Sequence, residues 1–186
     1  REFAESLKGF KAVGALRFAE SQTRNVVHFN RVALDVGLNS AKTAFTLGLD
    51  DRCDVDRYNE QLSLLCNIEG AAILQRRAQE DPEVLAIFRN HEAPSLRDVA
   101  ELEASIAALA RAQNLDDAWI WNRSAQSLAD FFDHLPAESC NPDIDKPEEI
   151  RLFRIRQAME RLVLMVQRRS VFSPEAGLHS ALGVNP

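Results

Sequence analysis

Three arginines repeat at regular spacing near the end of the sequence, and they are the residues best suited to bind a charged partner. Arg154, Arg161 and Arg168 are seven residues apart, which places them on one face of a helix. A guanidinium group can form two parallel hydrogen bonds with a carboxylate or a phosphate. The pattern therefore predicts a partner-binding surface on this helix. Its opposite side carries an apolar arc that should face the core: Leu152, Ile155, Met159, Leu162 and Val166.

A second group of polar residues lies near the start of the sequence. Arg24, His28 and Arg31 share one narrow face of a predicted helix, and we expect them to form a second partner-binding surface. The alternative for both arginine groups is a solvated face, or pairing with carboxylates of the acidic middle of the same chain.

Four aromatic residues form a cluster in the second half of the sequence: Trp119, Trp121, Phe131 and Phe132. Large aromatic side chains usually supply hydrophobic core. They could instead line a ligand pocket, and the alternative hypothesis is a helical small-molecule-binding or enzyme-accessory domain with an aromatic-lined pocket.

The histidines and cysteines form no recognisable metal-binding or catalytic pattern. The 4 histidines never occur as H-x-x-x-H or E-x-x-H, the spacings that place metal ligands on one helical face. The 3 cysteines include no C-x-x-C pair, and the glycine-rich nucleotide motifs and the G-x-S-x-G motif are absent. We therefore expect no metal, no cofactor and no catalytic residue, and we interpret the protein as non-enzymatic.

The elements that must position these residues are predicted to be helices. The chain has only 7 Gly and 7 Pro, whereas a β-rich chain needs turn residues at short intervals. Ser95 and Asp98 have the spacing of a capping box at the start of a helix. Apolar residues recur at helical spacing within residues 3–47, 54–79, 82–90, 95–114, 116–135 and 147–172. The sequence predicts an all-α bundle of five or six helices with long first and last helices.

Length and composition favour a single domain. With 186 residues, 46% of them hydrophobic, we expect one helical domain over residues 1–172 and a loosely ordered tail over 173–186. No apolar run approaches the length of about 18 residues that can cross a bilayer. The unpaired, widely spaced cysteines suit a reducing compartment, so we expect a cytoplasmic protein without a membrane span.

Charge is unevenly distributed along the chain. The net charge is −6, and residues 49–149 hold 22 acidic side chains against 9 basic ones, which disfavours nucleic acid as a partner. Two apolar strips on residues 26–47 predict that one side is covered by a second copy or by another protein. The hypothesis is therefore a non-enzymatic protein that acts by protein–protein interaction, as an adaptor, regulator, chaperone or assembly subunit, and forms a homo-oligomer.

Overall fold

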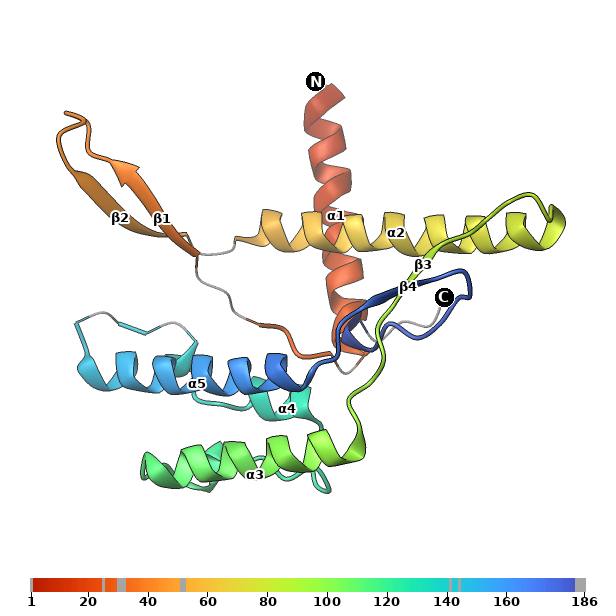
Figure 1. The fold of residues 1–186 in the computed structure, drawn as a ribbon. Helices are drawn as coiled ribbons and strands as arrows, with labels where there is room; N and C mark the ends of the chain where they lie inside the picture. Colours follow the sequence, from red (N-terminus) through yellow and green to blue (C-terminus); the bar gives the residue numbers. More distant parts are fainter. Residues whose placement is uncertain are drawn as a thin grey trace. The chain divides into compact units, whose positions relative to one another are not determined.

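The chain is mostly helical, as predicted, with a few short strands. The computed structural model describes residues 2–24, 26–29, 33–50, 53–140, 142–143 and 145–182. Within these ranges it contains five α-helices and four strands (Figure 1). The narrower prediction, a bundle with long first and last helices, is not confirmed.

The chain divides into two compact units. Unit 1 comprises residues 1–20 and 29–67, and unit 2 comprises residues 21–28 and 68–186. The prediction of one helical domain over 1–172 and a loosely ordered tail over 173–186 stays a prediction.

Unit 1 consists of two helical segments and a β-hairpin. Its helical parts come from α1 (Glu2–Gln22) and from the start of α2 (Asp54–Glu80). β1 (Ala33–Leu38) pairs antiparallel with β2 (Phe45–Asp50). The two helices approach closely at Gly14, where an added Cβ would lie 2.4 Å from the Cβ of Tyr58. The ring of Phe10 meets that of Tyr58 edge to face, with the centroids 6.4 Å apart.

The hairpin occupies residues that we predicted to be helical, so that prediction is wrong. Turn chemistry explains the difference. The side-chain oxygen of Asn39 accepts hydrogen bonds from the backbone amides of Thr43 at 2.9 Å and Ala44 at 3.4 Å. Lys42 has a φ of 55°, a left-handed conformation that ends any regular helix. Apolar residues at helical spacing therefore belong to two strands joined by a local turn.

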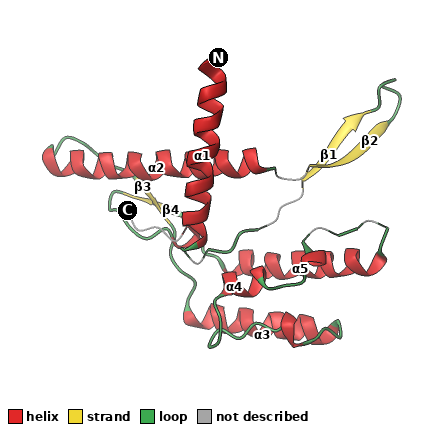
Figure 2. Ribbon diagram, turned by 180° about the vertical axis from the view of Figure 1, so that it is seen from behind, coloured by secondary structure: helices red, strands yellow, loops and turns green. Residues whose placement is uncertain are grey.

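Unit 2 contains a hydrophobic core built from three helices. These are α3 (Leu96–Ala112), α4 (Leu128–Asp133) and α5 (Pro147–Val166). α5 lies beside α3 in both views (Figure 2). Short 3-10 helices, Asp117–Trp119 and Ala137–Ser139, pack against α3 and α5 respectively. The largest fully buried apolar side chains lie here: Phe131, Phe132, Ile106 and Met159.

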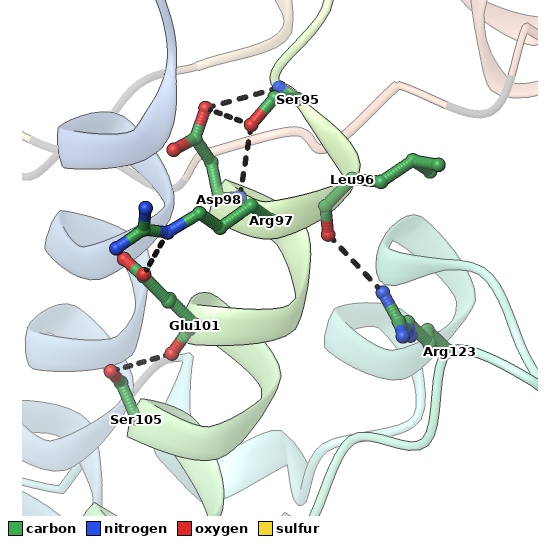
Figure 3. A network of polar contacts seen from close by, with 7 residues as sticks. All are labelled: Ser95, Leu96, Arg97, Asp98, Glu101, Ser105 and Arg123. Atoms are coloured by element: carbon green, nitrogen blue, oxygen red, sulfur yellow. Dashed lines mark hydrogen bonds and ion pairs between the residues drawn. The ribbon is translucent and has the colours of Figure 1, made fainter.

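The start of α3 confirms the predicted capping box. The Ser95 hydroxyl accepts a hydrogen bond from the Asp98 amide at 3.1 Å, and the Ser95 amide donates to the Asp98 carboxylate at 3.1 Å (Figure 3). Each of these bonds gives a partner to one backbone amide that would otherwise lack one at the helix end. In the first turn of α3, Arg97 forms an ion pair with Glu101 at 2.8 Å. The guanidinium of Arg123 donates a hydrogen bond to the backbone oxygen of Leu96 at 3.4 Å.

Two further segments of unit 2 differ from the predicted helices. Residues 82–90 form a turn and a strand, β3 (Phe88–Asn90), instead of a short helix. β3 pairs antiparallel with β4 (Val171–Ser173), so the last helix ends at Val166 and not near residue 172. Residues 116–135 form the 3-10 helix and α4, separated by turns. A final 3-10 helix covers Ser180–Leu182.

Candidate functional site

The outer face of α5 and of the residues just after it is basic. From residue 150 to residue 169 the exposed side chains comprise four arginines, a leucine and a methionine: Arg154, Arg161, Leu164, Met165, Arg168 and Arg169. The one carboxylate of this stretch belongs to Glu160, which is buried. We call these six exposed residues the α5 face. An exposed helix face without a carboxylate is unusual in a chain with 28 acidic and 22 basic side chains, and it favours an anionic ligand.

The α5 face forms because the opposite side of the helix is apolar. Ile155, Met159 and Val163 are buried against unit 2, and residues on the other side of the helical wheel must then face solvent. The structure thus places Arg154, Arg161 and Arg168 at the surface. Leu164 and Met165 lie among them, and Met165 is 80% exposed.

The three predicted arginines differ in their neighbours. Arg154 and Arg161 have no ion pair or hydrogen bond with any described residue. Arg168 pairs with Glu92 at 2.7 Å, and both side chains are at least half exposed. A solvated ion pair of this kind contributes little to stability and can exchange partners. Two guanidinium groups are therefore open to a ligand, and a third is weakly held.

Another arginine of α5, Arg156, has the opposite environment. Its side chain is buried and pairs with Glu160 at 3.1 Å. It also donates to the backbone oxygen of Phe132 at 2.9 Å, and its guanidinium lies 5.5 Å from the centre of the Phe132 ring. These contacts fix α5 to α4. Sequence reasoning missed this pair, although the four-residue spacing beside Ile155 and Met159 was a usable signal.

The second predicted basic group does not form an exposed face in the described residues. Arg24 and His28 are half-buried, so much of each side chain is removed from solvent. Arg31 lies outside the described residues. A role for these three residues in partner binding stays a prediction.

The four aromatic residues of the alternative hypothesis are all buried in unit 2. Phe131 and Phe132 pack edge to face with ring centroids 5.3 Å apart. A cavity of about 420 Å³ lies in unit 2, and of these four residues only Trp121 lines it, together with aliphatic side chains of α3 and α5 such as Val99, Leu102 and Val163. The indole of Trp121 donates to the backbone oxygen of Gln126 at 3.2 Å. Trp119, Phe131 and Phe132 contribute to packing of the core.

The described ranges contain neither a membrane-spanning helix nor a metal-binding cluster. None of their helices is both long enough and apolar enough to span a bilayer. Within the same ranges, no three His, Cys, Asp or Glu side chains are grouped so that they could hold a metal ion. The expectation of a cytoplasmic location stays a prediction.

Comparisons with known proteins relate the fold to that of one ribonuclease. No family model matches the sequence, and no curated protein matches it. Among solved structures, RNase R of Mycoplasma genitalium bound to ribose-methylated single-stranded RNA is 16% identical with a TM-score of 0.64. The match covers 97% of this chain and 24% of that one. The apo form matches equally well, and the complex with double-stranded RNA has a TM-score of 0.61 at 17% identity.

The comparison extends over nearly the whole chain but over a limited part of RNase R. This chain spans about a quarter of the length of the structures it matches, 24% to 28%. At this level of identity the likeness concerns the fold.

The comparisons overturn the predicted function and partners. We expected an adaptor, regulator, chaperone or assembly subunit, with another protein or a second copy as partner and nucleic acid disfavoured. The three structures named above are of a ribonuclease, and two of them contain RNA. The prediction rested on the acidic excess of residues 49–149, and an acidic segment does not determine the charge of every surface of the protein. This chain therefore resembles RNase R in fold over 97% of its length.

Proposed function

We propose that this chain is an RNA-binding part of an RNase R-like protein and that the α5 face contacts the phosphates. The observation that carries the proposal is the likeness in fold to RNase R, which covers 97% of this chain. The proposal concerns binding and assigns no chemical step to any residue of this chain.

The chemistry of the α5 face supports a phosphate ligand. Arg154 and Arg161 are exposed and have no partner among the described residues, and a planar guanidinium suits the bidentate binding of a phosphate. Seven residues of helix separate the two groups by about 10 Å. The two groups can thus contact different phosphates of one nucleic-acid chain. Contacts of this kind bind RNA without reading its sequence.

The acidic excess of the whole protein does not oppose this proposal. Charges that are exposed and more than about 8 Å apart are largely screened at physiological ionic strength. The exposed residues between 150 and 169 include no carboxylate, and the nearby Glu92 carboxylate is paired with Arg168, so Arg154 and Arg161 keep their charge for a ligand. The remaining acidic residues reduce non-specific binding elsewhere on the surface.

Fluorescence anisotropy with labelled RNA tests the proposal. The full chain is titrated against single-stranded and double-stranded oligonucleotides over a range of salt concentrations. Each phosphate contact contributes about 0.7 to the slope of log K against log salt for a single strand. The double variant Arg154→Ser/Arg161→Ser should therefore bind more weakly and lose about 1.4 from that slope.

A matched control removes the same charge from another helix of unit 2. Arg97 and Arg111 are exposed residues of α3, and Arg97→Ser/Arg111→Ser changes the net charge by the same amount. This control should keep most of the wild-type affinity and slope. Absence of RNA binding by the wild-type chain at low salt would refute the proposed function. Equal losses in the two double variants would show that α5 is not the binding surface.

A further inference from the structure

The segment after α5 is attached to β3 by two histidines that lie 88 residues apart in sequence. His91 and His179 form a parallel bridge. The His91 amide donates to the oxygen of Leu178 at 2.9 Å, and the Ser180 amide donates to the oxygen of His91 at 2.8 Å. The two imidazole rings stack with centroids 5.3 Å apart and planes inclined by 24°. We call this contact the histidine clasp.

A serine side chain contacts the first ring of the clasp. The Ser180 hydroxyl lies 2.7 Å from Nδ1 of His91 and 3.0 Å from the backbone oxygen of Glu92.

The second ring has no acceptor for a proton on Nδ1. The Nδ1 atom of His179 is buried and has no hydrogen-bond partner among the described residues. A lone pair at this position costs less than a buried, charged N–H without an acceptor. Partial burial, and next the positive charge that His91 can carry, lower the pKa of His179 below its ordinary value of 6.5.

The charged groups around the clasp also disfavour protonation. On the β3 side, Arg89 donates to the Ser170 hydroxyl at 2.8 Å and contributes to the lowered pKa of His179. The nearby carboxylate of Glu92 is already paired with Arg168 at 2.7 Å. Beyond β4, the backbone oxygen of Glu175 accepts a hydrogen bond from the side-chain amide of Asn90 at 2.9 Å. No described carboxylate is hydrogen-bonded to either imidazole to stabilise a second positive charge.

We propose that His91 and His179 form a pH-sensitive clasp, which holds residues 171–182 on β3 at neutral pH and releases them on acidification. Protonation of His179 in the closed state places a positive charge in a partly buried ring that lies beside His91 and near Arg89. In the open state the ring of His179 is hydrated and takes up a proton at an ordinary pH. Acid therefore favours the open state by linkage.

The clasp goes beyond RNA binding and does not depend on it. Its position next to Glu92 nevertheless places it beside the α5 face, because Glu92 is the ion-pair partner of Arg168.

Amide hydrogen exchange of the full chain, measured by NMR between about pH 8 and pH 5.5, tests the proposal. Protection factors are used because they correct for the intrinsic pH dependence of exchange. Protection of the Ser180 amide should fall by up to about tenfold over this range, since one unit of pH below 6.5 shifts the linked equilibrium by up to that factor. Amides in the middle of α3 serve as the reference and should keep their protection.

Two variants and one titration make the proposal falsifiable. His179→Asn should abolish the acid-dependent loss of protection, whereas His134→Asn, at an exposed histidine of unit 2, should leave it unchanged. If His179→Asn opens the segment at neutral pH, the wild-type titration of the His179 ring still decides: a pKa at or above 6.5 would overturn the clasp. An unchanged acid response in a folded His179→Asn chain would overturn it as well.

Discussion

Unit 1 and unit 2 both contain many large apolar side chains, but they use them differently. Among the residues whose burial is described, which leaves out 33–35 and 47–50 of the hairpin, every buried large hydrophobic residue belongs to unit 2, including Ile106, Phe131 and Met159. In unit 1, Phe3 is 86% exposed and Phe45 is 78% exposed. Buried apolar area is the main source of folding free energy, so the stability of this chain resides in unit 2.

The same comparison explains why a candidate ligand surface is found on unit 2. A binding surface needs side chains on an element that is fixed by packing. α5 meets this condition, because its inner side is buried in the core while its outer side carries the arginines. The exposed face of an element with little buried area would not hold its side chains in a defined arrangement.

The largest expected effect is in the core of unit 2, at Arg156. Replacement by Met removes the buried ion pair with Glu160 and the hydrogen bond to Phe132. Breaking a buried ion pair by removing one of its members typically costs about 3–5 kcal/mol. The free energy of unfolding, from urea denaturation, should fall by that amount.

The control for this prediction is an arginine of the same helix. Arg161→Met changes the charge and side chain identically at an exposed position, where substitutions usually change stability by no more than about 0.5 kcal/mol. Similar losses in the two variants would mean that α5 does not bury one side and expose the other.

A smaller effect is expected in unit 1, where the contact between α1 and α2 depends on Gly14. Gly14→Ala introduces a Cβ only 2.4 Å from that of Tyr58, and overpacking of this kind costs about 1–3 kcal/mol. The protein has 1 tyrosine, so the NMR signals of the Tyr58 ring report on this contact directly. The Tyr58 signal should change at a lower urea concentration than in the wild type.

Gly9→Ala is the matched control on α1. No atom lies within 4 Å of a Cβ at Gly9, and alanine is the better helix former by about 1 kcal/mol. This variant should be at least as stable as the wild type. If Gly14→Ala behaves in the same way, α1 and α2 do not meet at Gly14, and unit 1 has even less packing than described.

Much of the helical structure could be predicted from the sequence, whereas the strands could not. α2, α3 and most of α5 lie within the predicted ranges, because each has a long apolar repeat and a recognisable start. The hairpin was missed because its apolar residues also fit a helical repeat. The overlooked signals were local: Gly37, Gly48 and the turn-forming Asn39, all of which disfavour a continuous helix.

The surface position of the candidate residues could be derived from the sequence only where one helix determined it. The exposure of Arg154 and Arg161 follows from the helical wheel of α5. The stack of His91 on His179 has no counterpart in the sequence pattern, because the bridge between these two residues joins positions 88 residues apart. The likeness in fold to RNase R also has no counterpart in a sequence motif, since no family model matches the chain.

The smallest expected effect concerns the start of α3, in unit 2. Ser95→Ala removes the side-chain acceptor for the Asp98 amide, and loss of such a cap costs about 1 kcal/mol. Ser105→Ala is the control, since Ser105 is an exposed residue in the interior of the same helix whose hydroxyl donates to the oxygen of Glu101. If Ser95→Ala lowered the free energy of unfolding as much as Arg156→Met does, core contacts would not contribute more to stability than helix caps.

The stabilisation of the protein by the Ser95–Asp98 cap should depend on pH. The hydrogen bond from the Ser95 hydroxyl, and next that from the Ser95 amide, lower the pKa of Asp98 below its ordinary value of 3.8. A carboxyl group whose pKa is lowered in the folded state stabilises the protein above its unfolded pKa, and this contribution is lost as the pH falls through the folded value. Ser95→Ala removes the larger cause of the shift. The difference in melting temperature between wild type and Ser95→Ala should therefore narrow as the pH is lowered below about 4. A difference that is constant from neutral to acidic pH would show that Ser95 acts on the backbone of α3 alone and not through the carboxylate of Asp98.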